Sequence, residues 1–137
     1  MDTIPVERVS LEYAAAVDAG DLDRLEDLLA EDVVDHHLPP DLPTGRAGVR
    51  AWIALLKKAL GLRVEVLDVV AGADRVAVRA RITGQHVGDF GGLAATGRSF
   101  AAEYHSVERI AEGRIVERWE VADTAAITAQ LTGGSAA

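Results

Sequence analysis

Ionisable side chains gather in the last third of this 137-residue sequence, between Gly84 and Asp123. The segment predicts three long strands, a glycine-rich crossover and a tight turn at Glu112 and Gly113. Its predicted inward positions mix His, Glu, Arg and Trp with Val and Ala. A sheet that lines only a hydrophobic core has no use for so many ionisable groups, whereas a sheet that lines a pocket does. We therefore expect the functional site on these strands.

The strand predicted at residues 114–122 carries the strongest polar candidates. Because side chains alternate along a strand, Arg118 and Glu120 share one face with Val116 and Ala122. The opposite face carries Ile115, Trp119 and Val121. Arg118 and Glu120 either line the pocket or form an ion pair on an exposed face.

Histidines are further candidates, because imidazole takes and returns a proton near neutral pH. His36 and His37 are adjacent on a predicted extended segment, so their side chains point to opposite sides. One of them is expected to enter the pocket while the other meets solvent, unless both are surface groups. His105 shares parity with Val107, which indicates a buried side and either a catalytic or a structural role. His86 is expected at the rim of the pocket or as a hydrogen-bonded structural group.

No metal site is expected. The histidines form neither a His-x-His pair nor a helical His-x-x-x-His pair with a carboxylate, and the chain has no cysteine. The glycine-rich stretch 88–97 joins two strands, so it is not a phosphate-binding loop. Phe90 in this stretch either lines the mouth of the pocket or covers the sheet edge. Trp52 and Trp119 either pack in the core or contact a ligand.

The elements that position these residues change their hydrophobic period near Gly61. Before it, spacings of three and four predict helices at about 4–19, 22–29 and 46–60, with a short β segment from Val33 to His37. After it, a period of two predicts strands at Arg63–Val70, Arg75–His86, Arg98–Ile110 and Arg114–Ala122. Helices followed by antiparallel strands indicate an α+β fold, in which a curved sheet cups the helices and forms an open cone.

Composition predicts one globular domain at residues 1–132 with a flexible tail at 133–137. The net charge of −8 opposes nucleic-acid binding, which needs a basic patch. No apolar run approaches the roughly 20 residues that cross a bilayer, and no signal-peptide pattern opens the sequence. These features, with the lack of cysteine, predict a cytoplasmic protein without a membrane partner.

Three segments together resemble the SnoaL-like polyketide cyclase family of the nuclear-transport-factor-2-like superfamily. They are VVDHHLPPDLPTGRAGVRAWI, LRVEVLDVVAGADRVAVRARITGQHVGDFGGLAATGRSF and ERIAEGRIVERWEVAD. The resemblance extends over about residues 5–125 and implies a cone-shaped, cystatin-like α+β barrel with an antiparallel sheet on three N-terminal helices. This fold hosts cyclases, isomerases, dehydratases, epoxide hydrolases and binding domains, so it does not by itself identify a reaction.

The resemblance also implies site residues. Cyclases of this family pair an acidic residue on the last strand with a histidine on its neighbour. Glu120 and His105 are the best match, with Asp123 as the acid if a bulge shifts the register. The run YAAAVDAGDLDRL resembles ketosteroid isomerase, which implies that Tyr13 donates to an enolate oxygen. His37 falls near the catalytic base of that isomerase, where this chain has His instead of Asp.

The function implied is a cofactor-independent enzyme acting on a small, hydrophobic, polyketide-like substrate. It would close a ring by an intramolecular aldol-type reaction, or perform a related proton transfer, on an enolisable polycyclic ketone. The catalytic residues would be Glu120, His105, Tyr13 and His37. The substrate contacts would be His36, Trp52, Phe90, Arg118 and Trp119. The alternatives are an epoxide hydrolase or a double-bond isomerase, and a non-catalytic binding or dimerisation module.

A homodimer is expected to form through the sheet. Arg79, Arg81 and Glu117 are predicted to lie outside the pocket, on a surface where opposite charges can pair across a two-fold axis.

Overall fold

The computed structural model describes residues 4–133 and has the expected α+β architecture. Four helices and a short 3₁₀ turn accompany a five-stranded sheet. The helices are α1 (Val6–Ala19), α2 (Leu25–Leu28), α3 (Gly45–Leu60) and α4 (Thr124–Leu131), and the 3₁₀ turn is η1 (Leu22–Arg24). The strands are β1 (Leu29–Asp35), β2 (Arg63–Gly72), β3 (Arg75–Gln85), β4 (Ser99–Ala111) and β5 (Arg114–Ala122). The predicted fold class is therefore confirmed.

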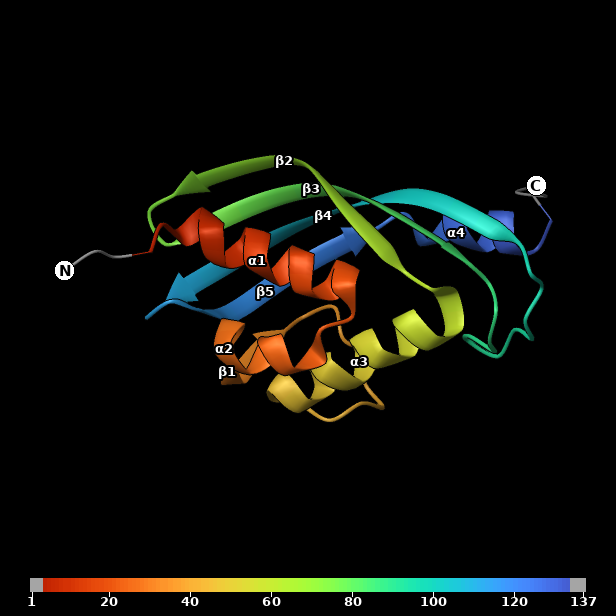
Figure 1. The fold of residues 1–137 in the computed structure, drawn as a ribbon, viewed down its shortest axis with the longest axis horizontal. Coiled ribbons are helices and arrows are strands. Elements are labelled where there is room, and N and C mark those ends of the chain that lie inside the picture. Colours follow the sequence, from red (N-terminus) through yellow and green to blue (C-terminus); the bar gives the residue numbers. More distant parts are fainter. Residues whose placement is uncertain (1–3, 134–137) are drawn as a thin grey trace.

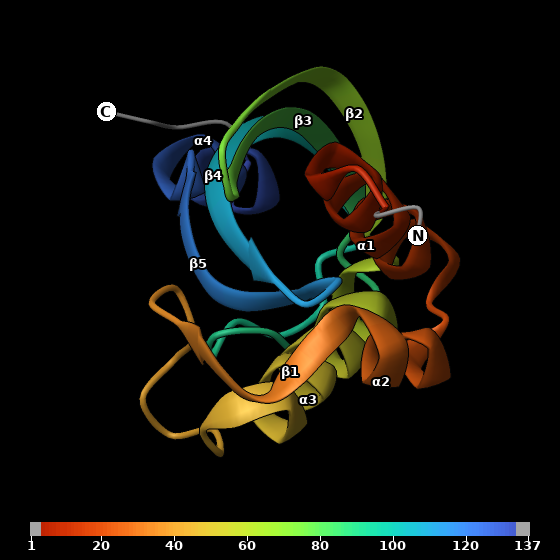
Figure 2. The same ribbon diagram turned by 90° about the vertical axis from the view of Figure 1, so that its left-hand side faces the viewer.

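The sheet has the strand order β1-β5-β4-β3-β2. Strands β2 to β5 pair antiparallel with their neighbours, whereas β1 pairs parallel with β5. The predicted antiparallel sheet thus has one parallel edge pair. Figures 1 and 2 show how β2, β3, β4 and β5 curve into an arc, with α1 at its open side and α3 beneath. This curvature makes the inner face of the sheet concave.

Helices α1 and α3 form as their apolar spacing predicts. Val9, Tyr13 and Val17 of α1 are buried at spacings of four, which places one stripe of the helix against the sheet. Gly20 ends the helix in the left-handed conformation, with φ of 68°. Gly61 ends α3 in the same way, with φ of 53°. The helix predicted at 22–29 is shorter and divided, because the chain becomes extended at Leu29, where β1 begins.

Helix α4 was not anticipated from the sequence. The Asp123 side chain caps it by accepting a hydrogen bond from the Ala126 amide over 3.1 Å. Gln130 holds the helix against β4, since its side chain exchanges hydrogen bonds with the backbone of Ala101. The helix falls inside the predicted domain. The flexible tail predicted at 133–137 lies outside the described residues except for Gly133.

The two faces of β4 are the reverse of the prediction. Tyr104, Ser106 and Glu108 are buried on the concave face, whereas His105 and Val107 point outward. The sequence pattern placed Val107 inside because valine is usually buried. Instead, the interior of this sheet contains polar side chains.

Strand β5 follows the predicted alternation at Arg118 and Glu120, which face inward with Ala122, but not at Ile115. A β-bulge shifts the pairing, so that Arg109 opposes Glu117 while Ile110 opposes Ile115. Val116 is the extra residue, and Ile115 is therefore fully buried rather than exposed.

In residues 4–133, no helix has the length and apolarity required to cross a membrane.

Candidate active site

A cavity of about 370 Å³ lies between the concave face of the sheet and helices α1, α3 and α4. Most of its wall is apolar, with contributions from Val17, Ile53, Leu56, Ile82, Phe100 and Ile127. Polar groups enter the wall from His37, Arg118, Glu120 and the tyrosines Tyr13 and Tyr104, and from two threonines of α4. The volume suits a small ligand of a few rings.

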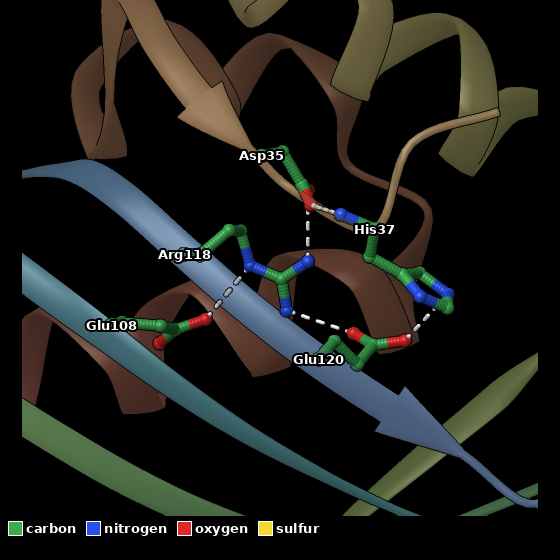
Figure 3. Close-up of polar contacts among 5 residues, drawn as sticks. All are labelled: Asp35, His37, Glu108, Arg118 and Glu120. Atoms are coloured by element: carbon green, nitrogen blue, oxygen red, sulfur yellow. Dashed lines mark hydrogen bonds and ion pairs between the residues drawn. The ribbon is translucent and has the colours of Figure 1, made fainter. Parts of the chain in front are cut away.

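Arg118 is the centre of the polar groups, and three carboxylates surround its guanidinium (Figure 3). Nη2 donates to Glu120 over 2.8 Å, Nη1 donates to Asp35 over 2.9 Å and Nε donates to Glu108 over 3.1 Å. The four side chains come from three adjacent strands: Asp35 from β1, Glu108 from β4, and Arg118 and Glu120 from β5. The register of the sheet places them together, since Asp35 and Glu108 both pair with Arg118.

This cluster is buried and rich in negative charge. The Arg118 side chain is 5% exposed, and those of Asp35 and Glu108 are 2% exposed. Burial alone lowers the pKa of Arg118, but the three surrounding carboxylates outweigh it and hold that pKa well above the ordinary value of 12.5. Arg118 is therefore a permanent cation whose three nitrogens are all engaged. It orients Glu120 and has little capacity left to bind a substrate anion.

His37 and Glu120 form the polar contact that lies on the cavity wall. His37 Nε2 is 3.1 Å from Glu120 Oε2, while the other oxygen of Glu120 accepts the bond from Arg118. The His37 amide donates to Asp35 Oδ1 over 2.9 Å, which fixes the chain directly after β1. Of the two adjacent histidines, His37 is thus the one that faces the pocket. The pair can exchange a proton with a ligand, because imidazole and carboxylate meet at the edge of an apolar space.

Tyr13 and Tyr104 supply neutral donors next to this pair. Burial raises the pKa of Tyr13, and the nearby carboxylates raise it further despite the opposing effect of Arg118. Burial also raises the pKa of Tyr104. The Arg118 guanidinium stacks over the Tyr13 ring at 5.2 Å from its centroid. Both phenols therefore remain protonated and can donate to a ligand oxygen.

Trp52 and Phe90 line the cavity from α3 and from the stretch between β3 and β4. Their ring centroids are 5.9 Å apart and the ring planes are tilted by 37°. His86 holds the base of the same stretch: it is fully buried, its Nδ1 accepts the Thr96 amide over 3.2 Å, and it lies 3.0 Å from the Thr96 hydroxyl. His86 is therefore buried beneath this stretch, away from the cavity wall, with Nδ1 hydrogen-bonded and Nε2 without a partner among the described residues.

Four residues expected in the pocket, His36, His105, Trp119 and Asp123, lie elsewhere. His105 points outward with its side chain 66% exposed, and Glu120 pairs across the sheet with Ser106 instead. Trp119 is also on the outer face, where it stacks against the ring of His36. Asp123 caps α4 and does not contribute to the cavity wall. His105 and Trp119 lie outside for the same reason: the odd-numbered positions of β4 and of the second half of β5 face away from the helices.

Sequence reasoning missed Asp35, Glu108 and Tyr104. Asp35 directly precedes the two histidines, so its parity with His37 was an available signal. Glu108 shares parity with Phe100 and Tyr104, two aromatic residues that mark the buried face of β4. Among the described residues, no group of three or more His, Cys, Asp or Glu side chains is arranged to hold a metal ion. The clustered carboxylates converge on Arg118 instead.

Comparison with known proteins gives a consistent result. The sequence profile of the family described as SnoaL-like polyketide cyclase matches residues 7–131. TsrD from Streptomyces laurentii is 25% identical and superposes with a TM-score of 0.86, with 98% of each chain covered. IdmH from Streptomyces antibioticus, described as a candidate polyketide cyclase, is 30% identical with a TM-score of 0.82, covering 94% of this chain and 99% of its own.

AclR from Streptomyces galilaeus, described as a candidate hydroxylase, is 27% identical with a TM-score of 0.80. It covers 93% of this chain and 95% of its own. A search of curated proteins gives no match. Similar folds therefore carry different described activities, and the site itself must indicate the chemistry.

Proposed function

Because this chain belongs to the SnoaL-like polyketide cyclase family, we propose that it catalyses proton transfer on an enolisable polycyclic ketone, leading to aldol-type ring closure. The observation that carries the proposal is the contact between His37 and Glu120 at the wall of an apolar cavity. A module that only binds a hydrophobic ligand has no need of two convergent ionisable groups at that wall. A proton-transfer enzyme does.

The proposed reaction begins with a proton on the carbon next to a substrate carbonyl. The His37–Glu120 pair accepts this proton, the C–H bond breaks, and its electron pair becomes the enolate. Tyr13 donates a hydrogen bond to the enolate oxygen, as its raised pKa keeps it protonated. The enolate carbon then attacks a second carbonyl of the same molecule, a C–C bond forms, and the new alkoxide takes the proton back from the pair.

Arg118 has a positioning role in this proposal. Its bond to Glu120 Oε1 leaves Glu120 Oε2 directed at His37. Asp35 and Glu108 hold the guanidinium from the other sides, so the carboxylate of Glu120 cannot turn without breaking a buried network. Trp52 and Phe90 would contact the flat faces of the ring system.

The proposed proton abstraction is best tested with a probe compound that undergoes only this first step. 2-Tetralone is a bicyclic ketone whose C1 carbon is acidic because it is both benzylic and next to the carbonyl, and the molecule is small enough for the cavity. In deuterium oxide, the protein is expected to speed exchange of the benzylic hydrogens, which proton NMR follows directly. Exchange no faster than with an equal concentration of free imidazole and acetate would contradict the proposal.

The alternatives give different outcomes with other probes. A double-bond isomerase would exchange the same hydrogens and also shift the double bond of a β,γ-unsaturated ketone. An epoxide hydrolase would convert styrene oxide to its diol and leave 2-tetralone unexchanged. Each activity is read from the product in the same NMR tube.

A further inference from the structure

His36 and His37 contact side chains on the two opposite faces of β5. His37 contacts Glu120 on the concave face, and His36 contacts Glu117 on the outer face, where its Nε2 is 2.7 Å from Glu117 Oε2. Glu117 and Glu120 are three residues apart on a strand, so their side chains point in opposite directions. The backbone of β5 therefore runs between the two imidazoles.

The outer-face contact of His36 is extensive for a surface residue. Its side chain is 44% exposed, yet its ring also stacks on Trp119, with centroids 5.2 Å apart and planes within 11°. Arg75 covers the same indole, at 5.4 Å from the ring centroid. Arg109 donates to the second oxygen of Glu117 over 3.3 Å. His36 is thus held both by a hydrogen bond to Glu117 and by a stack on Trp119.

Glu117 is a dependable anchor for this contact. The hydrogen bond from His36 is the main cause that lowers the pKa of Glu117, and Arg109 adds to it against the opposing effect of desolvation. The carboxylate therefore stays ionised over the range in which an enzyme works. Glu117 and Trp119 lie on β5 and Arg109 lies on β4, so the residues that hold His36 in place belong to the sheet.

The backbone of His36 links its outer-face contacts to the cavity. The His36 amide donates to the Arg118 carbonyl over 3.0 Å and extends the β1–β5 pairing by one residue beyond Asp35. After His37 the chain leaves the sheet in a stretch containing Pro39, Pro40 and Pro43. His36 is therefore the last sheet-bound residue before the imidazole that faces the cavity.

We propose that His36 is a positioning residue for His37: by clamping the outer face of β5 through Glu117 and Trp119, it fixes where the His37 imidazole meets Glu120. This inference rests on the proposed function of the His37–Glu120 pair. It assigns a role in the reaction to a side chain that never enters the cavity. Displacement of a catalytic group by about 1 Å can reduce a rate by roughly 100-fold, so a clamp of this kind has a measurable effect.

Three variants separate the two contacts of His36. His36→Gln keeps a hydrogen-bond donor for Glu117 and loses the ring, His36→Phe keeps the stack on Trp119 and loses the hydrogen bond, and His36→Ala loses both. His105→Ala is the matched control, because His105 is also an exposed outer-face histidine next to a glutamate, 3.6 Å from Glu103. It lies on β4, where its strand partners are Arg79 and Val121.

The readouts are the steady-state constants for hydrogen exchange on the tetralone probe and the ring NMR signals of His37. His36→Ala is expected to lower kcat by roughly 10-fold or more while KM stays nearly unchanged, because the apolar wall that binds the probe is intact. His36→Gln and His36→Phe should retain intermediate kcat values. The His37 ring signals should shift most in His36→Ala and less in the other two variants, while His105→Ala leaves both readouts at the wild-type values.

Two results would overturn the inference. One is wild-type kcat and unshifted His37 signals in all three His36 variants. The other is a loss of kcat that equals the loss of folded protein measured by circular dichroism. Failure of the proposed function looks different: Glu120→Gln and His37→Ala would retain full exchange. In that case the NMR signals of His37 in His36→Ala still decide whether His36 positions it.

Discussion

Arg118 Nη2 and Glu120 Oε1 are 2.8 Å apart on the concave face of β5, two positions from each other along one strand. The two oxygens of the Glu120 carboxylate therefore have different partners. One oxygen belongs to the buried network around Arg118, and the other lies 3.1 Å from His37 at the cavity wall. Glu120 is thus the residue through which a fixed electrostatic network meets the space that a substrate would fill.

Replacing Glu120 by Gln keeps the shape of the side chain and removes its negative charge. If the His37–Glu120 pair accepts the substrate proton, 2-tetralone exchange should fall by roughly 100-fold or more. Glu103→Gln is the control, since Glu103 is exposed on the outer face, where it pairs with Arg79. Equal exchange rates in the two variants would remove Glu120 from the mechanism.

His105→Ala should leave exchange unchanged, in contrast to the expectation from sequence. The side chain points away from the cavity and its nearest charged partner is Glu103, on the same face. Steady-state exchange rates for this variant and for His37→Ala provide the comparison. A large loss in His105→Ala would mean that a second site on the outer face takes part.

Arg118→Met should destabilise the fold by about 3–5 kcal/mol, because three buried carboxylates lose their common cation. Urea unfolding followed by circular dichroism measures the change. Arg109→Met is the control: its ion pair with Glu117 lies on the outer face, so the expected cost is below about 1 kcal/mol. Adding Glu108→Gln to Arg118→Met should restore part of the loss, as Glu108 Oε1 has no hydrogen-bond partner among the described residues.

Stability should fall when the pH rises above about 10. Burial raises the folded-state pKa of Tyr13 and of Tyr104 above the ordinary value of 10.0. Above that value the unfolded chain loses phenolic protons that the folded protein keeps, so the stability contributed by these residues is complete at lower pH and is lost as the pH increases. Thermal unfolding of Tyr13→Phe and Tyr104→Phe measures this, and each variant should show a weaker alkaline decline than the wild type.

The protein is expected to form a homodimer through the outer face of the sheet. Val107 and Val121 are exposed there, and the charges of Arg79, Arg81 and Glu103 surround them, so two copies can bury the valines and pair opposite charges across a two-fold axis. Light scattering at micromolar concentration should return twice the 14.5 kDa chain mass. A Val121→Lys variant should return the single-chain mass, and a wild-type monomer would contradict the prediction.

The sequence predicted the elements of this fold well, because hydrophobic period is a local property. The helix over 46–60 and the strand over 114–122 match α3 and β5 closely. Helix α4 escaped because its apolar residues are nearly uniform around the helix and leave no clear stripe. The SnoaL-like resemblance, which covers most of the chain, is confirmed by the family match over residues 7–131.

The site was harder to predict for a physical reason. Alternation identifies a buried face only when buried residues are apolar, and here Ser106 and Glu108 occupy the buried face of β4 while Val107 is outside. The phase taken from Val107 therefore placed His105 in the cavity. On β5 the phase of Arg118 and Glu120 was correct. The buried polar residues that form the site therefore reverse the apolar alternation from which the buried face of β4 was predicted.

The bulge at Val116 bears on how this chain tolerates insertions and deletions during evolution. By leaving Val116 unpaired, it lets both Ile115 and Arg118 face inward, although strict alternation would place them on opposite faces. The hairpin end of β5 and the end that carries Arg118 are thereby uncoupled in register. We expect a change of one residue in the hairpin to be absorbed at the bulge, whereas in a regular strand it would shift the register and turn Arg118 and Glu120 to the other face. We therefore expect the loop end of this sheet to accept a change in length without moving the side chains on its concave face.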